Sequence, residues 1–168
     1  GVVLHHMTEC ASSRDAFNQW NEVYLAAGCE QKPGLVMLDS GCFRSLAGKA
    51  THDRMIAYLK PWGIRPVWVP QQEEFIVGNC NTEMSDRNYM YPVFFNGKLC
   101  DVVDFARVKP ECPPLLSKKV MKHWDVILNF GEQETVVNKY AHKAPFIKNS
   151  AFLDLFDLGS PETFDRTK

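Results

Sequence analysis

The sequence predicts a mainly β fold with added helices, and three observations lead to this prediction. Between Ile64 and Val108, short runs rich in aromatic and β-branched residues follow one another, which is typical of strands. Asn96-Gly97 separates two of these runs, and this dipeptide is a strong signal for a tight hairpin. Elsewhere, apolar residues recur at helical spacing. The hydrophobic fraction of 45% and the charged fraction of 23% are ordinary for a globular protein.

The first predicted element is an amphipathic helix near the N-terminus. Ser12 or Ser13 can cap it, and Gly28 can end it. Its apolar positions follow helical spacing: Ala16, Phe17, Trp20, Val23, Tyr24 and Ala27. We expect this stripe to pack on the next part of the chain, because apolar stripes usually face a core.

A wholly apolar run, Leu35-Val36-Met37-Leu38, comes next and suits a buried strand. It ends abruptly in Asp39-Ser40-Gly41. A second helix is predicted from Gly48 to Leu59, and Pro61 with Gly63 should end it.

The rest of the chain reads mainly as strands. The predicted strands are Val67-Trp68-Val69, Phe75-Ile76-Val77, Tyr89-Met90-Tyr91, Val93-Phe94-Phe95, Leu99 to Val103 and Leu115-Leu116. A short helix is expected at Lys118 to Trp124, and a last hairpin joins Val126–Phe130 to Thr135–Val137 around Gly131. The tail from Asn138 to Lys168 reads as a docking segment with a loose end.

The Asp39-Ser40-Gly41 triplet is the candidate site for chemistry. An apolar strand that ends in Asp places a carboxylate at the edge of a hydrophobic layer. Ser40 can form local hydrogen bonds, and Gly41 permits a tight backbone turn. The same three residue types also form many ordinary turns, so Asp39 as a turn residue that caps local amides is the alternative.

Two segments carry a resemblance to a known family. Leu35 to Cys42 (LVMLDSGC) resembles the active-site motif of retropepsin-type aspartic proteases, in which an apolar strand precedes Asp-Ser/Thr-Gly. Pro114 to Met121 (PLLSKKVM) resembles the second signature of that family, an apolar pair at the start of a helix, and Val126 to Phe130 resembles the strand that follows. The likeness spans Leu35 to Val137 and is nearest to the protease domains of retrotransposons. Ser117 stands where that family usually has Gly, and the segment from Trp68 to Tyr91 has Gly78 but no glycine-rich tip.

The resemblance implies a retropepsin-like subunit with a closed β-barrel. It divides the chain into an N-terminal helical extension (1–33), a protease domain (34–137) and a C-terminal docking tail (138–168). It also implies a homodimer that pairs two copies of Asp39 to activate a water and cleave an extended peptide or polyprotein, with no metal or cofactor. The implied site residues are Asp39, Ser40 and Gly41 for catalysis, and Cys42, Phe75, Val77, Gly78, Leu115 and Leu116 for substrate binding.

A second functional interpretation belongs to another class. The same fold can serve as a non-catalytic structural subunit of a larger intracellular or organellar assembly. In that role, the apolar residues at Ala16–Ala27 and Phe152–Phe156 would hold neighbouring proteins. A protease must dimerise through Asp39, whereas a structural subunit need not.

Composition and charge argue against several other functions. The net charge of −1 gives no general attraction to nucleic acid, and a solvated face explains the basic run Lys118, Lys119, Lys122 and His123. No apolar run approaches the roughly 18 residues of a membrane span, and the start of the chain lacks a secretory signal. We therefore expect six free cysteines in a reducing intracellular compartment, with an organelle not excluded. Cys42 with His52 or His123 as a thiol nucleophile is less favoured than a small buried Cys42.

Overall fold

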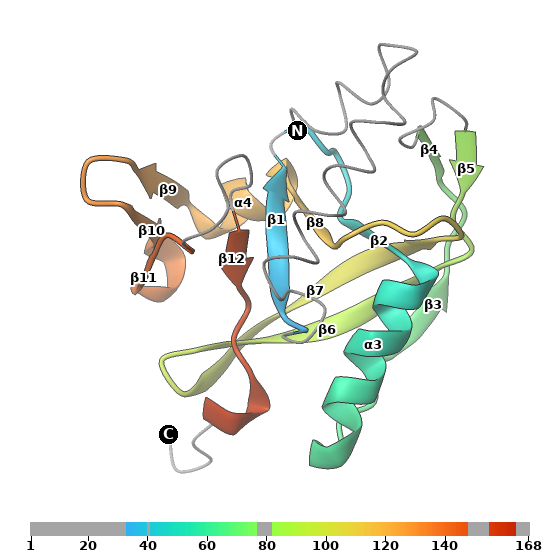
Figure 1. Cartoon of the computed structure of the whole chain (residues 1–168), viewed down its shortest axis with the longest axis horizontal. Coiled ribbons are helices and arrows are strands. Elements are labelled where there is room, and N and C mark those ends of the chain that lie inside the picture. Colours follow the sequence, from blue (N-terminus) through green and yellow to red (C-terminus); the bar gives the residue numbers. More distant parts are fainter. Residues whose placement is uncertain (1–32, 40, 77–81, 148–154, 164–168) are drawn as a thin grey trace.

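The computed structural model describes residues 33–39, 41–76, 82–147 and 155–163, and the predicted helix at Ala16–Ala27 lies outside this part. The described part is mainly β, as predicted. Its largest sheet has seven strands in the order β12-β1-β8-β2-β7-β6-β3 (Figure 1). In chain order these strands are β1 (Leu35–Asp39), β2 (Leu46–Gly48), β3 (Trp68–Pro70), β6 (Arg87–Phe95), β7 (Lys98–Val108), β8 (Leu115–Ser117) and β12 (Leu155–Asp157).

Two smaller sheets and two helices complete the described fold. One sheet has three antiparallel strands, β9 (Val126–Asn129), β10 (Glu134–Val137) and β11 (His142–Pro145). The other is the hairpin of β4 (Glu74–Ile76) and β5 (Thr82–Met84). The helices are α3 (Lys49–Leu59) and α4 (Lys118–Trp124), with 3-10 turns η1 (Lys60–Trp62), η2 (Asn138–Tyr140) and η3 (Pro161–Thr163). No described helix is both long and apolar enough to cross a membrane.

The hairpin of β6 and β7 is the longest feature of the main sheet. The predicted turn is confirmed, because Asn96 and Gly97 both have positive φ, of 53° and 71°, as a tight hairpin turn requires. Separate strands on either side of Pro92 were expected, and this expectation was wrong, because β6 runs through Pro92. The N–H groups of Met90 and Phe94 bond to Val67 and Leu158 on the side away from β7. Pro92 lies between them on that side, where no strand requires its missing N–H.

Helix α3 begins one residue after the predicted start and ends where predicted. Gly48 is its N-cap in an extended conformation, and Gly63 ends the following turn with a φ of 72°. Thr51, His52, Met55 and Leu59 form the buried face of the helix. This spacing of three and four residues explains why the segment folds as a helix against the sheet.

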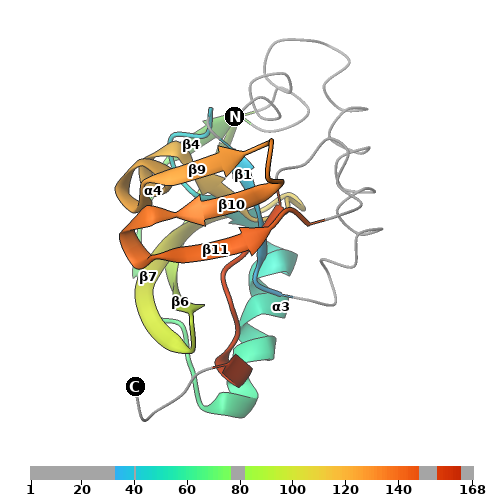
Figure 2. The same cartoon turned by 90° about the vertical axis from the view of Figure 1, so that its left-hand side faces the viewer.

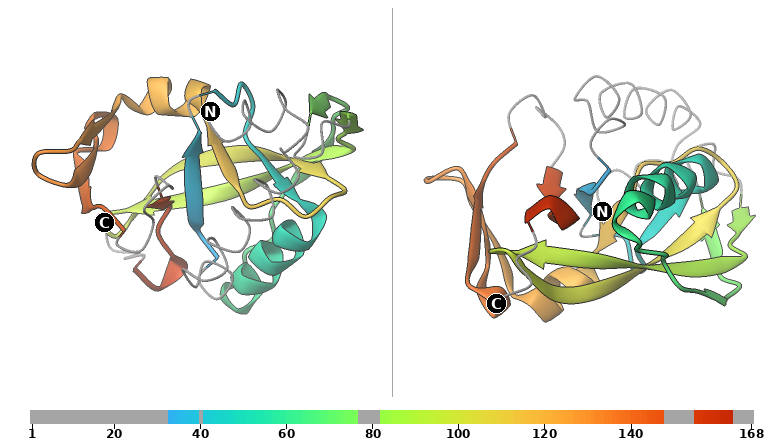
Figure 3. Two further views of the ribbon diagram at one scale, coloured as in Figure 1. Left: turned by 45° about the horizontal axis from the view of Figure 1, so that its top comes forward. Right: turned by 90° about the horizontal axis from the view of Figure 1, so that it is seen from below.

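The core joins elements that are distant in the sequence. Phe95 of β6 packs edge-on against Trp124 of α4 and Phe156 of β12, with both ring centroids 5.7 Å away. These aromatic contacts connect the main sheet to α4 and to the C-terminal strand. The sheet of β9, β10 and β11 lies at one end of the β6–β7 hairpin, and α3 lies toward the other (Figures 2 and 3).

The predicted closed barrel is not seen among the described residues. The main sheet has two ends, β12 and β3, and these two strands are not hydrogen-bonded to each other in the described part of the chain. Beyond Asn138, β11 pairs with β10 and β12 pairs antiparallel with β1, so strands from this segment belong to both larger sheets. The division of the chain into three parts stays a prediction.

Candidate active site

Asp39 is the last residue of β1, and β8 holds this strand from one side. The two strands are parallel, with Leu38 opposite Leu116 and Asp39 opposite Ser117. The pairing brings Asp39 next to the apolar pair before α4, although the two segments are far apart in the sequence. The side chain of Asp39 is nearly buried, with 3% of the residue exposed.

The backbone after Asp39 turns back towards β8. The N–H of Gly41 donates to Oδ1 of Asp39 at 3.3 Å, and the N–H of Cys42 donates to the carbonyl of Asp39 at 3.0 Å. The carbonyl of Cys42 accepts from the N–H of Lys118, the first residue of α4, at 3.1 Å. The N–H of Ser117 donates to Oγ of Ser45 at 3.0 Å. Two of these hydrogen bonds lie within the segment that follows β1, and the other two join this segment to the junction of β8 and α4.

The structure brings five of the nine predicted site residues together. Asp39, Gly41, Cys42, Leu115 and Leu116 lie on β1, β8 and the loop between β1 and β2, and all but Gly41 are buried. Phe75 is buried on β4, in the separate two-stranded sheet. Ser40, Val77 and Gly78 lie outside the described residues. Contact of these residues with a substrate stays a prediction.

Cys42, next to this site, is a free thiol with little nucleophilic character. Cys42, Cys100 and Cys112, the cysteines that the structure describes, form no disulfide. Burial raises the pKa of Cys42 to about 11, and its thiol donates to the carbonyl of Arg44 at 2.7 Å. Such a thiol is protonated at neutral pH, so it is a poor nucleophile.

His52, the histidine nearest in sequence to Cys42, forms its contacts with Tyr91 and Ala106. His52 is fully buried, with Nδ1 against the hydroxyl of Tyr91 and Nε2 3.0 Å from the carbonyl of Ala106. Burial lowers the pKa of His52 to about 4, so the ring is neutral at neutral pH. These contacts give His52 a structural position between α3 and the β6–β7 hairpin and offer no support for a Cys42–His52 pair.

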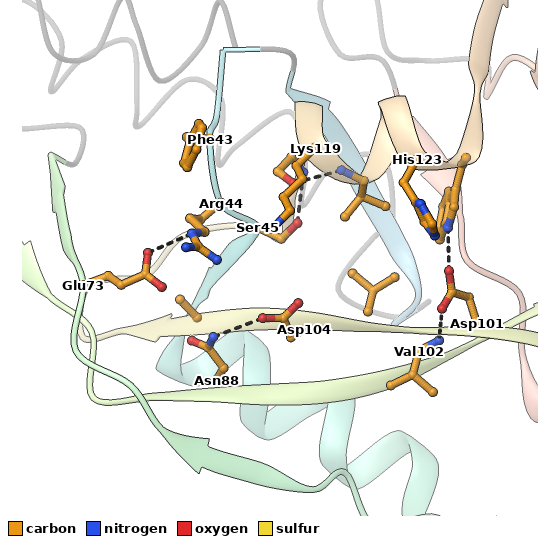
Figure 4. Close-up of a pocket in the computed structure, with 15 residues that line it drawn as sticks. Phe43, Arg44, Ser45, Glu73, Asn88, Asp101, Val102, Asp104, Lys119 and His123 are labelled. Carbon is orange, nitrogen blue, oxygen red and sulfur yellow. Dashed lines mark hydrogen bonds and ion pairs between the residues drawn. The ribbon is translucent and has the colours of Figure 1, made fainter.

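A cavity of about 230 Å³ lies beside the loop that follows Asp39. Phe43, Arg44 and Ser45 of this loop line one side, strands β6 and β7 form the floor, and α4 contributes Lys119 and His123 (Figure 4). Sequence reasoning missed this cavity, because its residues form no motif. One signal was available, since Asn88 is a polar residue in an otherwise strongly aromatic strand.

No group of three or more His, Cys, Asp or Glu side chains that could hold a metal ion occurs within the described ranges.

Comparison with known proteins adds little to the description of the site. No protein-family model matches the chain, and no curated protein matches it. A solved structure, the retroviral protease-like domain of Ddi1 from Leishmania major, is similar over 70% of this chain and 90% of its own, with 15% sequence identity and a TM-score of 0.43. A similarity this weak carries no argument about function.

Proposed function

We propose that the chain is one subunit of a retropepsin-type aspartic endopeptidase, of the kind found in retrotransposons, that acts as a homodimer on an extended peptide or polyprotein. One observation carries the proposal. The two segments that resemble the family's signatures lie side by side, with Asp39 directly opposite Ser117 on parallel strands. A turn residue that merely caps local amides would not require this pairing.

The order of the elements supports the same proposal. After the apolar strand that ends in Asp39 come β2, the added helix α3 and β3. The β4–β5 hairpin, the long hairpin at Asn96-Gly97, the apolar strand β8, helix α4 and strand β9 then follow. This order agrees with the parts of a retropepsin subunit. In that arrangement β4 and β5 would be the hairpin that closes over the substrate, and Phe75 would face it.

The departure at Ser117 has a local explanation. Ser117 is the N-cap of α4, and its hydroxyl accepts the N–H of Val120 at 3.4 Å. Its own N–H is bonded to Ser45. A serine at this position therefore strengthens the start of α4, a role that glycine performs less well, and it leaves the pairing of β8 with β1 intact.

The proposed chemistry follows from bringing two copies of Asp39 together on a two-fold axis. Two carboxylates so close cannot both ionise, so the pair shares one proton. The ionised member takes a proton from a water, which attacks the carbonyl carbon of the peptide bond. The protonated member donates to the carbonyl oxygen, and the resulting tetrahedral intermediate breaks down when the amine leaves with a proton. Ser40 and Gly41 would orient the two carboxylates.

The non-catalytic interpretation remains the second candidate, and the burial of Asp39 favours it. With 3% of Asp39 exposed in the single chain, a substrate reaches the carboxylate only after neighbouring segments rearrange. A protease would make this rearrangement on dimerisation or substrate binding. A structural subunit would keep Asp39 buried and remain inactive.

The decisive experiment combines the mass in solution with peptide cleavage at mildly acidic pH. We expect a mass of twice the chain mass of 19.2 kDa and cleavage that Asp39→Asn abolishes. Asp53→Asn, on the exposed side of α3, is the matched control and should cleave normally. A monomer without cleavage in wild type and both variants would refute the protease and favour the structural subunit.

A further inference from the structure

Helix α4 presents a cluster of basic side chains to solvent. Its inner side, with Val120, Met121 and Trp124, packs on the core. The opposite side is exposed and basic, and the fold extends it, because Nζ of Lys139 in η2 lies 2.5 Å from Nε2 of His123. We call this cluster the basic face, and its members are Lys118, Lys119, Lys122, His123 and Lys139.

The positive charge of the basic face is not balanced by ion pairs. Its lysines form none with the residues that the structure describes, whereas four arginines elsewhere in the fold are each paired with a carboxylate. Two acids close by are bonded to other groups: Asp125 accepts from Asn138, and Asp101 accepts from Trp124 and Tyr140. The whole chain has a net charge of −1, so the positive excess is local to this face.

These charges also lie where they cost helix stability. Lys118 and Lys119 are the first two residues of α4, and the first turn has no acidic residue. Positive charge at the start of a helix opposes the helix dipole, and like charges four residues apart, such as Lys118 and Lys122, repel each other. A sequence selected for stability alone would place acids in this turn. Departures of this kind are expected where a binding function compensates for the cost.

Chemistry and spacing indicate which anion fits the basic face. Its cations are lysine and histidine, without the arginine that proteins prefer for phosphate groups. Neither α4 nor η2 has an exposed aromatic ring on which a nucleic-acid base could stack. Lys118 and Lys122 are one helical turn apart, about 6 Å along the axis. Alternate side chains of an extended peptide are about 6.6 Å apart, so a peptide with carboxylates at alternate positions matches this spacing.

We propose that the basic face binds an acidic segment of an extended polypeptide. The lysine ammonium groups would hold its carboxylates. Backbone N–H groups at the start of the short helix are already used, since that of Lys118 donates to the carbonyl of Cys42 at 3.1 Å and that of Val120 to the hydroxyl of Ser117 at 3.4 Å. The binding therefore depends on the side chains, and it should weaken with added salt.

The position of the basic face suggests that the segment belongs to the substrate. The face begins directly after Ser117, which lies opposite Asp39 on the paired strands. Lys119 and His123 project from α4 beside the loop that follows Asp39 and line the cavity there (Figure 4). An acidic segment on this face would lie to one side of the cleaved bond. Identifying it as part of the substrate rests on the proposed function.

Binding is tested first without any cleavage. A decapeptide of alternating Glu and Ser, blocked at both ends and carrying a neutral dye, is titrated with the full chain at about 50 mM salt and followed by fluorescence anisotropy. The matched probes are the same peptide with Gln for Glu and hexathymidine, whose five phosphates equal the five carboxylates. We expect saturable binding of the Glu peptide, and at least tenfold weaker binding of the other two. Equal binding of the Gln peptide overturns the proposal, and tighter binding of hexathymidine overturns it in favour of nucleic acid.

Paired variants test whether the binding is local to this face. Lys119→Gln/Lys122→Gln should weaken binding of the Glu peptide at least fivefold. Lys49→Gln/Lys60→Gln, at the two ends of α3, removes the same charge from exposed positions and should change the affinity less than twofold. Lys119→Glu/Lys122→Glu should instead bind a peptide of alternating Lys and Ser. All four positions are exposed, so the variants should fold, which thermal unfolding verifies. Equal weakening by both Gln pairs overturns the proposal.

The link to the substrate has a separate readout. Asp39→Asn, which should abolish cleavage, should bind the Glu peptide as wild type does. In the active dimer, Lys119→Gln/Lys122→Gln should raise KM for a substrate with an acidic flank, leave kcat unchanged, and have no effect on the same substrate with a Gln flank. An unchanged KM overturns the link to the substrate. Binding of the Glu peptide by a chain that cleaves nothing would refute the protease and support an acidic segment of another protein as the ligand.

Discussion

The buried His52 makes the stability of this protein depend strongly on pH. In the folded chain, burial lowers the pKa of His52 from 6.5 to about 4, and the neutral ring has a carbonyl and a hydroxyl as partners. In the unfolded chain the ring is in water, where histidine has its usual pKa of about 6.5. As the pH falls below that value, the unfolded state takes up a proton before the folded state does. The protein therefore loses stability from about pH 6.5 down to about pH 4, and the loss is constant below that.

The size of the loss follows from the pKa difference. Each unit is worth about 1.4 kcal/mol, so the full effect is about 3 kcal/mol, and about 2 kcal/mol is already lost at pH 5. A domain of ordinary stability, roughly 5–15 kcal/mol, would lose a large share of it. This matters for the proposed function, because the cleavage assay at mildly acidic pH falls within this range.

Urea unfolding at a series of pH values between 8 and 4 measures the effect. The comparison is with His52→Gln, whose amide can still donate to the carbonyl of Ala106 but does not titrate. We expect the variant to be less stable at pH 8 and to lose about 3 kcal/mol less than wild type between pH 8 and pH 4. His123→Gln, on the exposed side of α4, should retain the full loss of wild type. An equal loss in His52→Gln and wild type would refute the reasoning.

Three further predictions concern other groups. Asp101→Ala removes the carboxylate that accepts a hydrogen bond from Nε1–H of the buried Trp124 at 2.8 Å. Urea unfolding at pH 7 should show that the free energy of unfolding falls by about 2–3 kcal/mol. A fall below about 0.5 kcal/mol would mean that water replaces the carboxylate. Gly159→Ala places a Cβ 1.9 Å from the carbonyl oxygen of Phe94, at a residue whose φ is +85°. Thermal unfolding should therefore show a decrease in the free energy of unfolding on the order of 3 kcal/mol. A stability close to that of wild type would contradict this geometry. At pH 8, mass-spectrometric mapping should show that iodoacetamide alkylates Cys42 at least about 100-fold more slowly in the folded chain than in urea, and equal rates would contradict its burial and raised pKa.

Local sequence patterns predicted most of the individual elements. The turn at Asn96-Gly97, helix α4 and the hairpin of β9 and β10 all formed where expected. These features depend on interactions between neighbours along the chain, such as positive φ in a turn or an N-cap at Ser117. Pro92 was misread because a proline interrupts a strand only where its N–H would be needed, and that depends on which strand lies beside it.

The candidate site was found only in part. The sequence pointed to Asp39 and to the Leu115-Leu116 pair, and it could relate them only through resemblance to a family. The cavity with Asn88 and Asp104 gave no motif at all, because its residues come from five separate segments. The one local signal, a polar Asn88 in a strand rich in aromatic residues, does not identify its partner Asp104, which lies diagonally opposite on β7.

The sequence by itself determined the mainly β character, the place of α3 and α4, and the carboxylate that ends the first buried strand. These follow from periodicity, turn chemistry and capping, which act over a few residues. The tertiary structure decided the parallel pairing of β1 with β8, the burial of His52 and Asp39, and the cavity beside the loop after Asp39. These depend on which apolar faces pack together, and that packing is a property of the whole chain rather than of any segment of it.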